Sequence, residues 1–222
     1  MQAIERQAGT IDWITLILLG CIILLAVIKV IYPQRFGEFM SLLTSGKFMM
    51  FKGKENHAFH PFNILMLFVN VGGVSLFLFI LLHFFFNITE NIPAVIVYVR
   101  IATAYASFVL LKMGIEKIVA NVFGLDEKVD YYLFRKLGYR NFISLFVLLA
   151  AILLTYTFTP TGPILYAILS FMIVGNILSL FVIYKQNQSI ISINLFYFIL
   201  YLCALEIAPY IILYKLFISN WG

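Results

Sequence analysis

The sequence predicts an all-α fold, a polytopic membrane helix bundle with six transmembrane helices and short amphipathic helices on the cytoplasmic side. Hydrophobic residues make up 63% of the 222 residues and charged residues only 11%, against about 25% charged residues in soluble domains. The mean hydropathy is +1.02. A soluble globule of this length could not bury so much apolar surface. The composition therefore excludes soluble enzymes, disordered chains and disulfide scaffolds.

Long apolar runs locate the expected spans, since about 20 helical residues cross the roughly 30 Å of hydrocarbon in a bilayer. The run 141–184 contains no Asp, Glu, Lys or Arg and is too long for one helix. The segment 159–163, Thr-Pro-Thr-Gly-Pro, divides it into two helices. We expect a single integral membrane domain over residues 1–222, with spans at about 13–32, 61–86, 92–111, 142–158, 163–184 and 190–218.

The basic residues predict the orientation of these spans. Lys and Arg gather in the connections 33–60, 112–140 and 185–189, whereas 87–91 and 159–163 contain none. The positive-inside rule places basic connections in the cytoplasm, so both termini are expected on the other side of the membrane. The formal net charge of +5 then indicates attraction to anionic lipid at the cytoplasmic face, and we expect no nucleic-acid partner.

The first cytoplasmic connection is expected to contain an amphipathic helix over residues 35–51. Phe36, Phe39, Met40 and Leu43 recur there at the spacing of one helical face. An apolar face flanked by basic residues is typical of helices that lie in the membrane interface. We therefore expect this helix to lie along the inner leaflet.

A second short helix is expected within 124–138. Asp126 can cap its start, acidic residues fill its first turn, basic residues fill its last turn, and Gly138 follows as its end. The acidic residues of this region, Glu116 included, are expected to be solvated or to cap helices. The helix can close the bundle as a surface element. Alternatively, it can dock a cytoplasmic or membrane partner through Asp126, Tyr131, Tyr132 and Arg135.

Two charged residues lie well inside the expected spans, where a charge costs about 2.5–3.5 kcal/mol on insertion scales. At 1.5 Å per residue, Arg100 lies about 10 Å and Glu206 about 18 Å from the outer ends of their helices. An Arg side chain can reach across most of that difference, so we predict that the two residues pair. His83 lies in the same outer half, and Pro209 loosens the helix beside the carboxylate. The pair can be a static contact or a proton- or ion-sensitive site.

Three further polar residues of the spans, Asn70, Tyr105 and Asn176, lie close in sequence to glycine or alanine residues. Small residues let helices approach closely, and amide and hydroxyl groups can hydrogen-bond across the contact. We expect these three residues to serve helix packing, which the pattern favours over a substrate path.

The sequence contains no recognisable motif for catalysis, a metal or a cofactor. A phosphate-binding glycine loop, Gly-x-Ser-x-Gly and His-Glu-x-x-His are all absent. His57 and His60, close to Glu55, form only a weak metal pattern and fit a polar interfacial loop better. Cys21 and Cys203 lie in apolar runs, so we expect small core residues rather than a disulfide.

Three segments carry a resemblance to a known family: Met113–Val119, Tyr131–Tyr132 and Leu205–Tyr210. Over most of its length the chain resembles an uncharacterised multi-pass inner-membrane family of Bacteroidota, a domain of unknown function. The resemblance implies a bacterial inner membrane, with both termini periplasmic, and it favours Glu206 and Pro209 as family features. It implies little about mechanism.

Three functions remain open from the sequence. The first is a non-enzymatic subunit or scaffold of a larger cell-envelope complex, of the secretion or motility type, with other membrane proteins as partners. The missing catalytic motifs and the amphipathic helices favour it. The second is a small proton- or ion-coupled transporter or channel that uses Glu206 with Arg100. The third is an interfacial lipid-acting enzyme with His57, His60 and Glu116 in its site.

Overall fold

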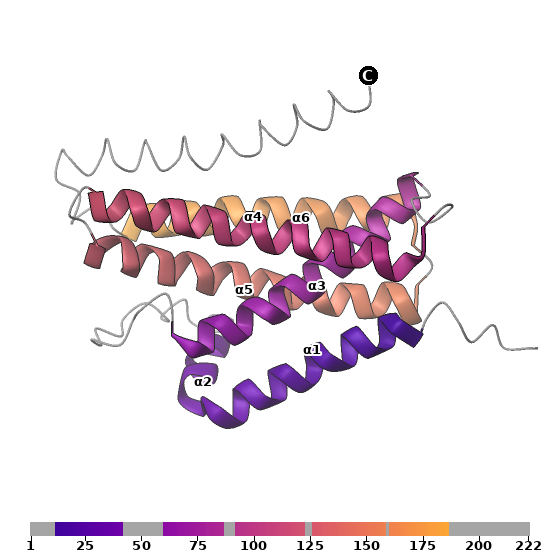
Figure 1. Ribbon diagram of the computed structural model, residues 1–222, viewed down its shortest axis with the longest axis horizontal. Coiled ribbons are helices and arrows are strands. Elements are labelled where there is room, and N and C mark those ends of the chain that lie inside the picture. The colour runs from indigo at the N-terminus through magenta and orange to yellow at the C-terminus, as the bar shows by residue number, and fades with distance from the viewer. Residues whose placement is uncertain (1–11, 42–59, 87–91, 123–125, 159, 187–222) are drawn as a thin grey trace, which may run out of the picture.

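The computed structural model describes residues 12–41, 60–86, 92–122, 126–158 and 160–186, and every regular element in these ranges is an α-helix. Figure 1 shows the long helices running side by side along the long axis of the molecule, with a short helix at the end of the first. The six helices are α1 (Asp12–Ile31), α2 (Pro33–Ser41), α3 (Pro61–Phe86), α4 (Ala94–Val122), α5 (Asp126–Tyr156) and α6 (Gly162–Gln186).

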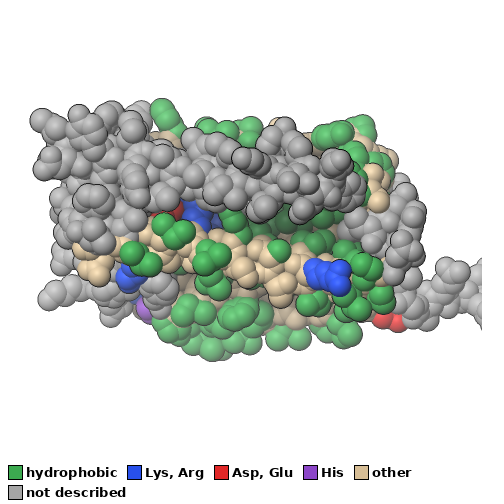
Figure 2. Space-filling view, turned by 45° about the horizontal axis from the view of Figure 1, so that its top comes forward, with side chains coloured by type: hydrophobic (Ala, Val, Ile, Leu, Met, Phe, Trp, Pro, Cys, Tyr) green, Lys and Arg blue, Asp and Glu red, His purple; other side chains and the backbone are tan. Residues whose placement is uncertain are grey.

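Five of these helices, all except α2, are long and apolar enough to cross a membrane. The mean hydropathy of their most apolar windows falls from 3.0 in α1 to 1.7 in α6. Figure 2 shows hydrophobic side chains gathered over one face of the molecule, with charged side chains only at scattered positions. The fold is therefore that of an all-helical membrane protein. The sixth expected span, 190–218, lies outside the described residues.

Helices α1 and α3 nearly coincide with the spans expected at 13–32 and 61–86. Helix α3 begins at Pro61, a position where the missing N–H of proline leaves no hydrogen bond unmade. His60 caps this helix, because the backbone N–H of Phe62 donates to its Nδ1 at 3.2 Å. The sequence indicated only a polar loop at His60.

Helix α5 is longer than predicted, and the end expected at Gly138 is wrong. The helix does not end at Gly138 but continues without a break to Tyr156. Gly138 is buried, and so is Leu137 beside it. Packing against the bundle outweighs the cost of about 1 kcal/mol for a glycine inside a helix. The short helix expected at the start of this region and the fourth expected span are therefore one element.

Helix α2 forms the first part of the amphipathic helix that was expected over 35–51, and the residues after Ser41 lie outside the described ranges. Its apolar face packs into the bundle. Phe39 is only 1% exposed, and its ring contacts those of Phe62 and Phe142 with centroid separations of 6.2 and 6.0 Å. Its placement along the inner leaflet stays a prediction.

Contacts at the two ends of the bundle show that successive long helices run in opposite directions. Tyr156 Oη donates to Thr15 Oγ1 at 2.7 Å, which joins the end of α5 to the start of α1. At the other end, the ring of Tyr32 after α1 packs edge-on against His60 before α3. We call this second end the basic end. Most basic side chains of the described residues lie toward it: Lys29, Arg35, Lys112, Lys117, Arg135, Lys136 and Arg140.

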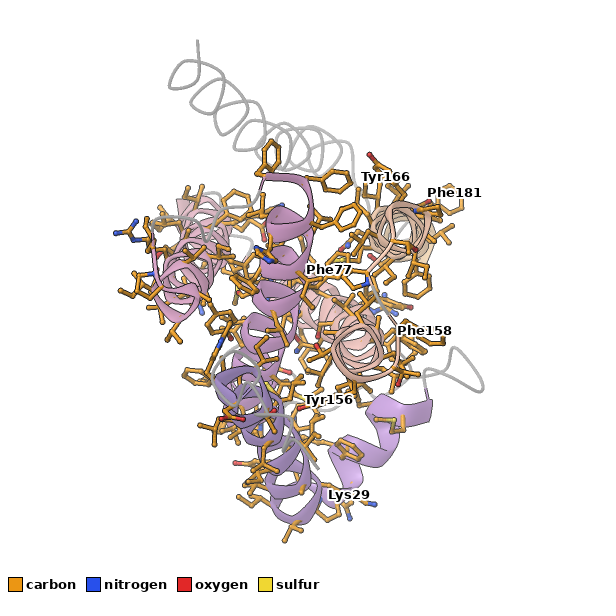
Figure 3. The ribbon with its side chains drawn as sticks, turned by 90° about the vertical axis from the view of Figure 1, so that its right-hand side faces the viewer. Lys29, Phe77, Tyr156, Phe158, Tyr166 and Phe181 are labelled. Carbon is orange, nitrogen blue, oxygen red and sulfur yellow. The ribbon has the colours of Figure 1, made fainter. Side chains whose placement is uncertain are left out.

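Helix α3 is the central element and packs against α1, α4 and α5. Figure 3 shows Phe77 of α3 inside the bundle, whereas Tyr166 and Phe181 of α6 lie on its outer surface. Phe77 is fully buried, and the other two side chains are 60% and 62% exposed. Helix α3 therefore forms the core against which α1, α4 and α5 pack.

Glycines allow α3 to approach its neighbours closely. A Cβ atom added at Gly73 would lie 3.1 Å from Leu148 Cβ on α5, and one added at Gly72 would lie 2.7 Å from Cys21 Sγ on α1. A Cβ atom at Gly175 of α6 would similarly lie 3.2 Å from Ile143 Cδ1 on α5. Small residues thus lie where the sequence predicted close helix contacts.

Replacing Gly73 with Leu should destabilise the bundle by about 1–3 kcal/mol, because the larger side chain overfills the contact between α3 and α5. The measurement is the thermal unfolding midpoint of the full-length protein in detergent. Gly20→Leu is the matched control, since a Cβ atom at Gly20 meets nothing within 4 Å and both changes gain the same helix propensity. Equal midpoints for the two variants would contradict the close contact.

Candidate functional site

An ion pair between a buried carboxylate and a partly buried ammonium group joins α4 to α5 toward the basic end. Lys136 Nζ donates to Glu116 Oε1 at 2.6 Å, and Glu116 is only 2% exposed. The expectation that Glu116 is solvated is therefore wrong. Because each charge offsets the other, neither carries the full cost of burial. Helix α4 continues to Val122, beyond the end expected at residue 111, and so carries Glu116 into this contact.

A cavity of about 510 Å³ lies beside this ion pair, with walls from α3, α4, α5 and α6. Its volume falls within the range of about 300–1,000 Å³ that is typical of small-molecule sites. Three basic side chains, Lys112, Lys136 and Arg140, line it toward the basic end. Apolar residues such as Val74 and Leu169 line the remainder. We call this space the four-helix cavity.

The three polar residues predicted for helix packing all line the four-helix cavity. Tyr105 Oη donates to Asn70 Oδ1 at 3.0 Å and so links α4 to α3. Asn70 is fully buried, and its Nδ2 has no hydrogen-bond acceptor in the part of the chain that the structure describes. Asn176 of α6 is exposed, and its Nδ2 donates to the carbonyl of Met172 at 2.7 Å. These residues therefore border a common space. Asn70 and Tyr105 also link two helices, whereas the hydrogen bond of Asn176 stays within α6.

Sequence reasoning missed Lys112, Lys136 and Arg140 as members of one site. A helical repeat could have linked Lys136 to Arg140, since residues four apart on a helix share a face; Lys112 lies on a different helix. Lys136, Arg140 and Ser144 follow this spacing along α5, and all three line the four-helix cavity. The expected helix end at Gly138 concealed the pattern, because it assigned Lys136 and Arg140 to different segments.

The predicted outer cluster is only partly within the described residues. Arg100 is exposed on α4 and forms no ion pair with any acidic side chain that the structure describes. His83 is exposed and stacks on Phe79, with ring planes 2° apart and centroids 6.0 Å apart. Glu206 and Pro209 lie outside the described residues. The pairing of Arg100 with Glu206 therefore stays a prediction.

The predicted docking residues lie at the start of α5. Arg135 is buried, with 5% exposure, so its side chain is not available to a partner in this structure. Asp126, Tyr131 and Tyr132 belong to the first turns of the helix, and their side chains are outside the described part. A docking role for this segment stays a prediction.

The described ranges contain only part of the weak metal pattern and one of the two cysteines. No three His, Cys, Asp or Glu side chains there lie close enough together to hold a metal ion. His57 and Cys203 lie outside these ranges. Cys21 is a buried free thiol against Gly72, which agrees with the small core residue expected at this position.

Removing one member of the Glu116–Lys136 pair should destabilise the protein more than removing both. Lys136→Met leaves the Glu116 carboxylate without its counter-charge, and Glu116→Gln leaves the Lys136 ammonium group without its own. Each single variant should therefore cost about 3–5 kcal/mol. The double variant should lose at least about 1 kcal/mol less than the sum of the single losses. The measurement is a double-mutant cycle of unfolding free energies in detergent. Strictly additive losses would contradict a direct interaction.

Comparison with protein families matches residues 14–217 to the domain of unknown function DUF4271. No curated protein and no solved structure matches the chain. The family match extends over all of α2 to α6 and nearly all of α1. It confirms the expected membership of an uncharacterised family, while an origin in Bacteroidota stays a prediction. Because the match includes nearly the whole sequence, this chain belongs to the DUF4271 family.

Proposed function

We propose that this protein is a non-enzymatic subunit or scaffold of a larger cell-envelope complex, of the secretion or motility type, in the bacterial inner membrane. Five apolar helices support a membrane location. The observation that carries the further step is a polar, exposed face on α4. This face is made of Arg100, Thr103, Ala104 and Ser107, and we call it the α4 polar face.

The α4 polar face is unusual for a helix in contact with lipid. Its four residues recur at the spacing of one helical face, within the 94–118 region that is apolar enough to span a membrane. All four are exposed. Thr103 Oγ1 donates to backbone oxygens of Val99 at 2.8 Å and Arg100 at 3.0 Å, so this hydroxyl is satisfied within the helix. The guanidinium group of Arg100, in contrast, is not satisfied by a hydrogen bond within the helix.

An exposed guanidinium and small side chains favour contact with another transmembrane helix. A charged Arg facing hydrocarbon costs about 2.5–3.5 kcal/mol on insertion scales, and an acidic partner offsets that cost. Ala104 and Ser107 are small enough to let a neighbouring backbone approach closely. The α4 polar face thus suits a helix that carries a carboxylate, supplied by a partner subunit.

A second candidate function is a small proton- or ion-coupled transporter that uses Glu206 with Arg100. The polar residues of the four-helix cavity favour a transport path inside the bundle, although Arg100 is not among the residues that line it. In this case the helix on the α4 polar face belongs to the same chain. A lipid-acting enzyme is less favoured, because two of its candidate residues already have structural partners. His60 Nδ1 accepts a hydrogen bond at the start of α3, and the Glu116 carboxylate is paired with Lys136.

Photocrosslinking in native membranes tests the subunit proposal. A photoreactive amino acid at Ser107, which is exposed on the α4 polar face, should give one discrete adduct with an envelope protein. The same probe at Val109, which is buried at 4% exposure, is the matched control and should give none. Arg100→Gln should lower the yield about fivefold or more, whereas Arg100→Lys should retain most of it because the charge is kept.

An adduct confined to the chain itself, or to lipid, would contradict the subunit proposal. The second candidate has its own measurement in proteoliposomes. A pH-dependent flux in the wild type that Glu206→Gln abolishes would favour the transporter, and flux at the level of empty liposomes in both proteins would exclude it.

A further inference from the structure

We propose that the four-helix cavity binds a phospholipid with a net anionic headgroup, its phosphate toward the basic end and an acyl chain toward the opposite end. This inference rests on the cavity and not on the α4 polar face. It therefore stands or falls independently of the subunit proposal. Three features of the cavity carry it, each at a different level along the bundle.

The polar and apolar parts of the cavity are separated along the helix axes. Asn70 and Tyr105 are in contact at 3.0 Å and mark a middle level. Lys112 lies seven residues further along α4, about 10 Å nearer the basic end, and Leu78 lies eight residues further along α3, about 12 Å the other way. All four residues line the cavity. A space of about 510 Å³ that extends so far is narrow, which suits a single acyl chain of a lipid.

The basic end of the cavity suits a phosphate group. Lys112 of α4 and Lys136 and Arg140 of α5 line it. Lys136 is paired with Glu116, and the described residues that line the cavity include no carboxylate. Arg presents a planar set of donors that matches phosphate oxygens, and Lys adds a compact charge. An anion at this level also lies where anionic headgroups gather if the basic end is cytoplasmic.

The middle level needs a hydrogen-bond acceptor. The Nδ2 group of Asn70 is fully buried and has no acceptor among the described residues, although buried polar groups are rarely left unpaired. Asn70 Oδ1 already accepts from Tyr105, so the amide is oriented with its donor unused. In a phospholipid the ester carbonyl oxygens lie between the phosphate and the acyl chain. An ester oxygen at this level would accept from Asn70, which inorganic phosphate held at the basic end could not do.

The remaining part of the cavity suits hydrocarbon. Val74 and Leu78 of α3 and Leu169 of α6 line it, and apolar side chains in this position favour an acyl chain over water. The order along the cavity is therefore cationic, then hydrogen-bonding, then apolar. That order matches the phosphate, ester and chain of one lipid molecule.

Native mass spectrometry of the full-length protein in mild detergent provides the test. Phosphatidylglycerol, phosphatidylcholine and inorganic phosphate are added separately. We expect one phosphatidylglycerol molecule to be retained with at least about tenfold preference over phosphatidylcholine, whose choline group is a cation. Equal retention of the two lipids would overturn the proposal. So would binding of inorganic phosphate at the same site without any need for a chain.

Two variants locate the lipid in the cavity. Lys112→Gln with Arg140→Gln should lower phosphatidylglycerol retention about tenfold. Lys29→Gln with Arg35→Gln removes two cations from outside the cavity lining and should leave retention unchanged. Leu169→Trp should fill the apolar part and lower the retention of both lipids. Equal retention in the cavity and control variants would overturn the proposal. Should the charge variant fail to fold, the headgroup preference of the wild type and the effect of Leu169→Trp still decide the matter.

Discussion

The contact between Glu116 and Lys136 is the constraint on which the rest of the arrangement depends. A charge inside an apolar bundle is costly unless an opposite charge lies against it. This pair meets that condition at 2.6 Å, and it does so between two residues that lie 20 positions apart on consecutive helices. It therefore fixes how far α4 and α5 are shifted along one another. The same shift brings Lys112, Lys136 and Arg140 to one end of a shared cavity.

The bundle is divided into helices that hold the fold together and helices that face outward. Glycines at positions 72 and 73 bring α3 against α1 and α5, and about half of the apolar windows of α3 and α5 is buried. In contrast, α4 and α6 expose most of their windows. Stability is therefore concentrated in α3 and α5, and α1 packs against α3. The features with functional potential, which are the α4 polar face and the four-helix cavity, lie on or beside the outward helices.

Local sequence was sufficient to predict the membrane class and the positions of most helices, because apolar runs and charge gaps directly reflect bilayer thickness. It also indicated that Asn70 and Tyr105 lie at helix contacts. The end predicted at Gly138 was wrong, since glycine signals a helix end only where tertiary packing does not compensate. Glu116 was misjudged for a related reason. Its counter-charge is 20 residues away, and no local pattern gives the register between two helices.

The four-helix cavity could not be predicted from any single helix. Each wall contributes a stripe of residues that is unremarkable alone, such as Asn70, Val74 and Leu78 on α3. Only the packing of four helices makes these stripes face one another. The expectation that the polar residues serve helix packing was therefore incomplete, because a side chain such as Tyr105 joins two helices and borders a cavity at the same time.

The peripheral position of α6 has a consequence for how the cavity can be reached. This helix packs mainly on α5, and side chains along it such as Ile173, Ile177 and Phe181 are more than half exposed. Of the four helices around the cavity, α6 has the smallest buried share of its apolar window. Moving it would therefore break the fewest apolar contacts. We expect that a lipid enters the cavity laterally from the bilayer, past α6. Its acyl chain then stays in hydrocarbon throughout, and its headgroup stays at the membrane surface. Such a lateral opening would let the protein exchange its bound lipid with the surrounding leaflet. No water-filled path between the two sides of the membrane would be needed.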